Sequence, residues 1–186
     1  KESNKEAFFT IKENFKHKIQ GIEEEEIFSE ENTPEKRNES PDKNKFQQDW
    51  LSLKDTHAFF PLIKKHKVSR LQALELAPEH DGVKYAKKVS NDVIKNSLEK
   101  IAETKTPIMV FVSNKGMIQI HTGPVKKLLE MKEWYNIMDP DFNLHIRTNS
   151  IKECWLVKKP TSDGDVNSIE IFNFNEELIC TFFGKR

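Results

Sequence analysis

The chain of 186 residues has no long apolar run, little cysteine and no net charge. None of its apolar stretches reaches the ~20 residues that a membrane-spanning helix needs, so the sequence predicts no membrane span. Its 30 basic and 30 acidic side chains cancel. A general nucleic-acid binder is normally basic, so the balance of charge argues against that class. These absences predict a soluble protein of the cytoplasm.

Several sequence motifs of catalysis and metal binding are also missing. Cys154 and Cys180 lie far apart in separate apolar runs, without the CxxC or Cys/His spacing of a zinc site. We expect them to be buried thiols in a reducing compartment. The sequence contains no glycine-rich phosphate loop, no nucleophile elbow around a serine and no HExxH pair. The common signatures of phosphate binding, serine hydrolysis and zinc proteolysis are therefore excluded.

The composition divides the chain into three parts. Residues 1–20 place apolar side chains at helical spacing, which predicts a short amphipathic helix. Residues 21–44 are acidic and offer too little apolar surface to offset the entropy of ordering, which predicts a flexible linker. Residues 45–186 have the composition of one compact domain. The helix and linker are typical of the tail of a preceding domain.

The periodicity of the compact domain changes from helical to strand-like near Pro107. Before it we expect three short helices between residues 44 and 77, a polar loop over 79–89 and a helix from Ser90 to about Thr104. After it we expect a short helix over 125–131 and a set of antiparallel strands, at 108–113, 117–122, 134–138, 142–147, 153–159, 168–174 and 178–183. The predicted fold is α+β, with short helices followed by a large antiparallel meander sheet.

The stretch from Trp50 to Arg70 carries the most suggestive chemistry. His57 lies beside two phenylalanines, and the cations Lys64, Lys65, Lys67 and Arg70 follow it. An imidazole, an apolar wall and cations suit ferric haem, whose iron takes a histidine nitrogen and whose propionates take Lys or Arg. The alternative is a surface histidine followed by solvated lysines. If His57 is not a ligand, His66 is the nearest substitute.

Two further groups of residues allow chemistry but favour structural roles. His121 and His145 fall on predicted strands and could share a metal, but no third ligand has suitable spacing. We expect them to be hydrogen-bonded residues of a sheet. Asp139 and Asp141 flank Pro140 and could form an acid–base pair, but turn formation explains them better.

Several blocks of the sequence resemble one family in the same order along the chain. They are WLSLKDTHAFFPLIKKHKVSRLQALELAP, PIMVFVSNKGMIQIHTGPVKKL, WYNIMDPDFNLHIRTNSI, WLVKKPTSDGDVNSIEIF and FFGKR. Together they resemble the HemS/ChuS family of bacterial haemin-degrading and haem-trafficking proteins, and the resemblance runs from about residue 46 to residue 186. Members of that family have two similar halves, and this chain resembles the C-terminal one. Residues 1–20 would then be the tail of a preceding repeat.

The resemblance implies a set of site residues. The histidine of the family's DTH motif, which ligates haem iron, matches His57. The cations that hold the propionates match Arg70, Lys159 and Arg186. Phe183 stands at a position near the haem edge where the family often has tyrosine, so the polar contact made there is missing from this chain.

The resemblance also implies a function. It is that of a cytoplasmic haem-binding protein of bacterial haem uptake and iron acquisition, of the haemin-degrading factor type. An oxygenase-like enzyme and a carrier that delivers haem to a separate oxygenase both remain open, since both need one histidine and one open haem face. A haem-independent interaction module is a third alternative. The expected partners are haem, a haem importer, and a separate haem oxygenase or reductase, with a missing first repeat or a second copy completing the pocket.

Overall fold

The computed structural model describes residues 5–15, 36–114 and 116–184, and it divides the chain into two units, 1–33 and 34–186. In the first unit, helix α1 covers Lys5–Phe15 and exposes Phe9 and Ile11. The rest of the helix expected over 1–20, and the linker up to residue 35, lie outside the described residues. No helix in the described part of the chain is long and apolar enough to cross a membrane.

The helices of the second unit are short. They are α3 (Lys43–Leu51), the 3-10 turn η1 (Thr56–Ala58), α4 (Phe59–His66), α5 (Arg70–Glu75) and α6 (Val93–Thr104). Side-chain caps start two of the α-helices: Asp42 accepts a hydrogen bond from the Lys45 backbone N–H at 3.0 Å, and Ser69 accepts one from that of Gln72 at 3.2 Å. Three short helices between residues 44 and 77 were expected from the sequence.

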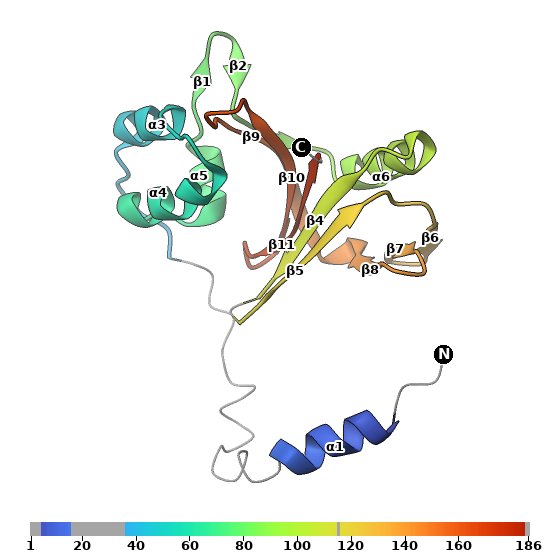
Figure 1. The fold of residues 1–186 in the computed structure, drawn as a ribbon. Helices are drawn as coiled ribbons and strands as arrows, with labels where there is room; N and C mark the ends of the chain where they lie inside the picture. The colour runs from blue at the N-terminus through green and yellow to red at the C-terminus, as the bar shows by residue number, and fades with distance from the viewer. Residues whose placement is uncertain (1–4, 16–35, 115, 185–186) are drawn as a thin grey trace. The chain divides into compact units, whose positions relative to one another are not determined.

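The strands form three antiparallel sheets. They are β1 (Glu79–His80), β2 (Val83–Lys84), β3 (Ala86–Val89), β4 (Ile108–Ser113), β5 (Ile118–Gly123), β6 (Leu128–Met131), β7 (Trp134–Met138), β8 (Asn143–Arg147), β9 (Ile151–Lys159), β10 (Val166–Asn173) and β11 (Leu178–Gly184). Six of them make the large sheet in the order β3-β9-β10-β11-β4-β5, three make the sheet β6-β7-β8, and β1 pairs with β2 (Figure 1). The fold is α+β, with short helices and a large antiparallel sheet.

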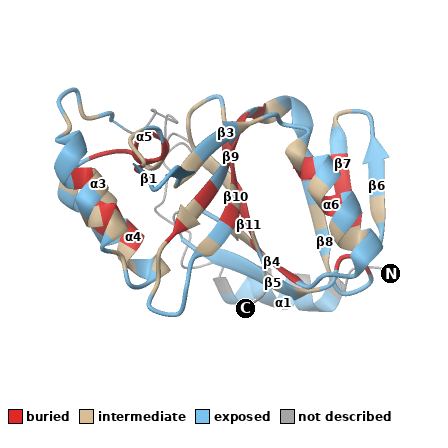
Figure 2. Cartoon of the chain, turned by 90° about the horizontal axis from the view of Figure 1, so that it is seen from above, coloured by how far each residue is buried: buried red, intermediate tan, exposed pale blue. Residues whose placement is uncertain are grey.

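The six-stranded sheet lies between two layers (Figure 2). Helices α3, α4 and α5 cover one face, where Trp50 and Phe59 pack against Trp155 and Phe172 of the sheet. Helix α6 and the three-stranded sheet cover the other face, around Ile171. The sheet thus has one core on each side.

Two predicted elements are wrong. Residues 79–89 are not a loop, because they form β1, β2 and β3, and β3 pairs with β9 at the edge of the large sheet. Residues 125–131 are not a helix, because Leu128–Met131 is strand β6, paired with β7. In that register Leu128 lies opposite Ile137 and packs against the core. Segment 86–89 was decided by a partner distant in sequence, the strand β9. Segment 128–131 was decided by pairing with the next strand, β7, and by packing of Leu128 against the core.

Candidate functional site

His57 lies in the turn η1, directly before helix α4. The Asp55 carboxylate caps this turn, and its Oδ1 lies 2.7 Å from both the His57 backbone nitrogen and the ring Nδ1. Because a carboxylate only accepts, the ring hydrogen is on Nδ1 and Nε2 keeps its lone pair. The side chain is 94 % exposed. A carboxylate behind a histidine in this way orients metal-binding imidazoles in many proteins.

An apolar depression begins three residues after His57, at the start of α4. It encloses about 640 Å³ and is lined by Lys36, Phe60, Pro61, Ile63, Lys64, Lys67, Val68 and Ser69. The Phe60 ring is 62 % exposed at this surface. A volume of this size suits a small organic ligand, and the combination of apolar lining and lysines suits one that is apolar with negative groups.

Arg70 and Lys159, both expected to hold carboxylates, meet at a buried glutamate. Arg70 Nε donates to Glu170 Oε2 at 2.7 Å, and Lys159 Nζ donates to Glu170 Oε1 at 2.5 Å. Arg70 comes from the first turn of α5, whereas Lys159 and Glu170 come from the neighbouring strands β9 and β10. We call these three side chains the Glu170 triad.

The Phe59 ring connects the Glu170 triad to the helix that follows His57. Lys159 Nζ lies 4.4 Å and Arg70 Cζ 5.6 Å from the centroid of the ring. The other side of the ring system meets Trp50 edge-on, with centroids 5.0 Å apart. Cations over an aromatic face are attracted by its quadrupole. Phe59 is therefore fixed between the cations and the helical core, two residues from His57.

The charges of the Glu170 triad stabilise one another. Burial on its own would raise the pKa of Glu170, but Lys159 and Arg70 outweigh it and bring this pKa to about 2. Burial lowers the pKa of Lys159 from its ordinary value, and the neighbouring Glu170 opposes that change. Glu170 is thus an ionised carboxylate at neutral pH, and both of its oxygens have cationic partners.

Of the remaining predicted site residues, Phe183 lies near the end of strand β11. Phe183 is half-buried, and its ring meets that of Phe111 edge-on at 4.9 Å. The strand register pairs Thr181 with Glu170 and Phe183 with Ser168, so Phe183 lies on the sheet face that carries the Glu170 triad. Arg186 lies outside the described residues.

His66 has a structural role. Its side chain is buried, its Nε2 lies 2.7 Å from Asp49 Oδ2, and its ring meets Phe46 edge-on at 5.2 Å. The same Asp49 oxygen accepts a hydrogen bond from Lys65 at 2.7 Å. His66 is thus engaged on the inner side of the helices, and His57 is the histidine of this region that faces outward.

His121 and His145 belong to different sheets, β5 of the large sheet and β8 of the small one. The His121 ring stacks on Phe142 with centroids 3.8 Å apart, and His145 Nδ1 lies 2.7 Å from Asn136 Oδ1. Within residues 5–15, 36–114 and 116–184 there is no group of three His, Cys, Asp or Glu side chains able to hold a metal ion. The hydrogen bond expected of a sheet histidine is present for His145, whereas the buried Nε2 of His121 has no hydrogen-bond partner among the described residues, and the ring packs by stacking instead.

Asp139 shapes the turn around Pro140. Its carboxylate accepts hydrogen bonds from the backbone N–H groups of Lys126 and Lys127, at 3.0 and 2.8 Å. These bonds give a partner to the two backbone N–H groups that precede strand β6. Turn formation therefore accounts for Asp139, as the sequence favoured.

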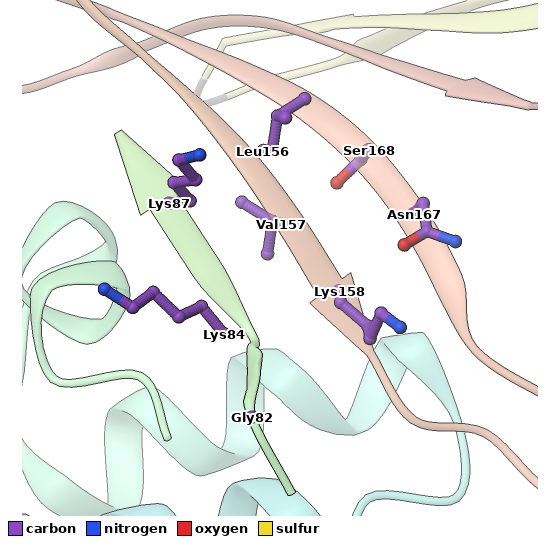
Figure 3. A pocket seen from close by; sticks show the side chains of 8 residues that line it. All are labelled: Gly82, Lys84, Lys87, Leu156, Val157, Lys158, Asn167 and Ser168. Atoms are coloured by element: carbon purple, nitrogen blue, oxygen red, sulfur yellow. The ribbon is translucent and has the colours of Figure 1, made fainter. Parts of the chain in front are cut away.

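A second depression, of about 540 Å³, lies over strands β3, β9 and β10 (Figure 3). The lysines around it, Lys84, Lys87 and Lys158, point in different directions. Lys158 pairs with Asp165 at 3.2 Å and Lys84 with Glu79 at 3.7 Å. Because the ammonium groups do not converge, this surface has the character of ordinary solvated lysines.

Glu170 is a residue of this site that was not among the predicted ones, although the sequence contains a signal for it. This glutamate stands between Ile169 and Ile171 in a strand that is otherwise apolar, and a charged residue inside a buried strand needs a partner. Its partners could not be found from sequence, because Arg70 lies 100 residues and Lys159 11 residues away along the chain.

The fold and the site define an α+β domain in which a helical layer on an antiparallel sheet presents one exposed histidine. The sequence of residues 67–186 matches the family described as "Haemin-degrading HemS.ChuX domain". This match spans more than half of the chain, and the chain belongs to that family. The matched range includes Arg70, Lys159, Phe183 and Arg186, whereas His57 precedes it.

Named proteins and solved structures that are similar to this chain are consistent with its membership of this family. The hemin transport protein HmuS of Yersinia pestis is 32% identical over 154 residues, which are 83% of this chain and 44% of HmuS. Holo-PhuS, a heme-binding protein from Pseudomonas aeruginosa, is 45% identical with a TM-score of 0.75, over 78% of this chain and 41% of that one. ChuS, an E. coli heme oxygenase, is 41% identical with a TM-score of 0.74, over 79% and 44%. The chain spans less than half the length of these relatives.

Proposed function

We propose that this chain binds haem in the cytoplasm and takes part in bacterial haem uptake and iron acquisition, as a protein of the haemin-degrading factor type. The observation that carries the proposal is His57, which exposes Nε2 to the outside while Asp55 holds Nδ1 at 2.7 Å. Neutral imidazole with one free nitrogen is the form that ligates haem iron. The iron ligand in this proposal is therefore His57 Nε2.

The surroundings of His57 fit the other parts of haem. The macrocycle needs apolar walls, which Phe60 and Pro61 supply in the depression after His57, with Phe183 at the haem edge. The propionates need cations, and we assign Arg70, Lys159 and Arg186 to them. In the structure Arg70 and Lys159 already share the Glu170 carboxylate, so a propionate would join an existing charge network.

Two versions of this function remain as proposals. In the first the chain contributes to haem degradation, and ChuS, described as a heme oxygenase, supports this version. In the second it carries intact haem from an importer to a separate oxygenase, and HmuS, named a hemin transport protein, supports that one. Since the chain spans 44% of either relative, we propose that a further repeat or a second copy completes the pocket.

The visible spectrum of the purified protein mixed with ferric haemin tests haem binding. We expect a shifted Soret band in the wild type and loss of most of the shift in His57→Ala. His80→Ala is a matched control, because His80 is also exposed and also faces a carboxylate, that of Asp81 at 3.4 Å. An unchanged spectrum in His57→Ala, or an equal loss in both variants, would contradict the assignment of His57.

A time course with ascorbate under air separates enzyme from carrier. Catalase is added to remove free peroxide, and the Soret band and the products are followed. Haem degradation needs a pocket that excludes water and so protects the reaction at the iron. In this chain, however, the His57 side chain is 94 % exposed. We therefore expect slow loss of haem without a defined product. Rapid formation of a single tetrapyrrole would show that the chain alone is an enzyme.

A further inference from the structure

The turn that carries His57 depends on its neighbours for its position. It is the three-residue turn η1, and none of its residues is buried. A single 3-10 turn fixes little by its own hydrogen bonds. On one side helix α4 continues from it, and the first residue of that helix, Phe59, is buried. On the other side residues 52–55 link it to helix α3 and form no helix or strand. Whatever holds this link therefore also holds His57.

The hairpin of strands β9 and β10 holds the link at both ends. At its start, Trp50 Nε1 near the end of α3 donates to the Lys158 carbonyl at 3.2 Å. Near its end, the carbonyl oxygen of Lys54 accepts two hydrogen bonds from one residue of the hairpin turn, Ser162. The backbone N–H of Ser162 donates at 3.0 Å and its hydroxyl at 3.1 Å. Ser162 thus anchors the chain just before the His57 turn.

This anchor joins the two ends of the proposed haem site. Lys54 directly precedes Asp55, whose carboxylate lies 2.7 Å from His57 Nδ1. Ser162 follows Lys159, to which the proposed function assigns a propionate, by three residues. The turn that ends the strand of the propionate cation therefore also binds the backbone that leads to the iron ligand.

We infer that Ser162 is a positioning residue of the proposed haem site, which fixes His57 relative to Lys159 through the Lys54 carbonyl. This inference rests on the proposed function and refines it. Lys159 and His57 contact the ligand, whereas Ser162 acts through the backbone that carries His57. A ligand that meets both residues at once binds best when their spacing is set in advance.

A ligand without iron separates positioning of His57 from a general effect on the pocket. Protoporphyrin IX has the ring and the two carboxylates of haemin but no metal, so it offers His57 nothing to ligate. Lys159 and the apolar walls serve both ligands alike. The affinity for ferric haemin divided by that for protoporphyrin IX therefore isolates the contribution of His57.

The experiment measures this ratio by quenching of tryptophan fluorescence in the wild type and in variants of Ser162. Ser162→Ala removes the hydroxyl bond and keeps the backbone bond, so the ratio should fall about threefold, the effect of one neutral hydrogen bond. Ser162→Thr keeps the hydroxyl and should restore the wild-type ratio. In a His57→Ala background, Ser162→Ala should not change the ratio, because the iron ligand is already missing.

Thr148 offers a matched control, in the 3-10 turn η2 (Thr148–Ser150) between strands β8 and β9. Its backbone N–H and its hydroxyl both donate to the Glu133 carbonyl, at 2.7 and 2.8 Å, as those of Ser162 do to Lys54. Both residues are exposed. Thr148→Ala removes an equivalent bond from a turn that carries none of the proposed site residues, so the ratio should stay at the wild-type value.

Several results would overturn the inference. They are an unchanged ratio in Ser162→Ala, an equal fall in Thr148→Ala, a fall that persists in Ser162→Thr, and a fall of the same size without His57. Each would mean that the Ser162 hydroxyl does not act through the iron ligand. Thermal melting checks that every variant is folded.

Failure of the proposed function gives a different result. A wild type that binds haemin no better than protoporphyrin IX, without a Soret shift that depends on His57, would contradict the proposed function and the inference with it. A wild type that prefers haemin through His57, with a ratio that Ser162→Ala leaves unchanged, would contradict the role of Ser162 alone.

Discussion

The two faces of the six-stranded sheet differ in whether charged side chains are buried beneath the layer that covers them. On the face covered by α6 and the three-stranded sheet, the core is apolar, with Leu98 and Ile137 packed around Ile171. On the face covered by α3, α4 and α5, the apolar core gives way to the Glu170 triad. Strand β10 serves both faces, because successive side chains of a strand point to opposite sides. One strand therefore supplies both the core and the charge network.

The pKa values of buried groups express the same contrast. On the apolar face, burial raises the pKa of the Cys154 and Cys180 thiols to about 12, so they stay neutral. On the helix-covered face, Lys159 and Arg70 overcome the effect of burial and lower the pKa of Glu170 to about 2. Burial alone thus favours neutral groups, and a charge persists only where partners of opposite sign are built in.

The largest expected effect is the loss of stability when the Glu170 triad on the helix-covered face is disrupted. Glu170→Leu removes the carboxylate and leaves the buried Lys159 and the partly exposed Arg70 without it, which should lower the free energy of unfolding by about 3–5 kcal/mol. Urea unfolding followed by tryptophan fluorescence measures this. The double variant Glu170→Leu/Lys159→Met should regain part of the loss, since it removes the inner cation as well. A loss below about 1 kcal/mol in Glu170→Leu would show that the triad is not energetically coupled.

A cavity on the apolar face provides the comparison. Leu98 on α6 is almost completely buried. Leu98→Ala should cost about 3 kcal/mol through lost apolar contacts and the cavity left behind. Because no charge is involved, the loss should be the same at about 0.05 M and about 1 M salt. Interactions between exposed charges become strongly screened over roughly this range of salt concentration, from about 0.05 to 1 M. A strong dependence on salt would contradict an apolar origin.

Acid should weaken the stabilisation that the Glu170 triad contributes on the helix-covered face, and it should leave the packing of the apolar face unchanged. Because the pKa of Glu170 is lowered from 4.5 to about 2, its stabilising effect is complete above the unfolded pKa and is lost as the pH falls toward the folded value. The loss should approach about 3 kcal/mol. Unfolding of the wild type and of Lys159→Met/Glu170→Gln is compared between about pH 5 and pH 2.5. Parallel curves for the two proteins would be evidence against the lowered pKa.

The smallest expected effect lies where the segment before α3 meets α5. The Asn38 backbone N–H donates to Gln72 Oε1 at 2.9 Å, and Gln72 Nε2 donates to the Asn38 carbonyl at 2.7 Å. Asn38 Nδ2 also donates to the His66 carbonyl at 2.9 Å. A chain beginning at Lys43 should therefore be less stable than one beginning at Pro34 by about 1–2 kcal/mol. Thermal melting of both chains measures this, with Asn38→Ala in the longer chain as the control. Equal melting temperatures would show that residues 34–42 contribute nothing.

Elements with a strong local signal could be predicted from the sequence. The helix at Val93–Thr104 follows from apolar side chains at helical spacing, and the hairpin of β4 and β5 follows from alternating residues around Asn114. Within that turn, Asn114 Oδ1 accepts hydrogen bonds from the backbone N–H groups of Gly116 and Met117. Such elements need only contacts between residues close in the chain, which is why their sequence suffices.

The sequence by itself also determined the family, and the resemblance to that family made His57 the candidate iron ligand, which stays a prediction. Tertiary structure alone decided that residues 86–89 join the sheet edge, since their partner strand β9 is distant in sequence. It also decided that Leu128–Met131 is a strand, since Leu128 packs against the core opposite Ile137. It also decided that Arg70 and Lys159 converge on Glu170. No local pattern encodes that convergence, because it requires a helix start and two strands to meet at one buried point.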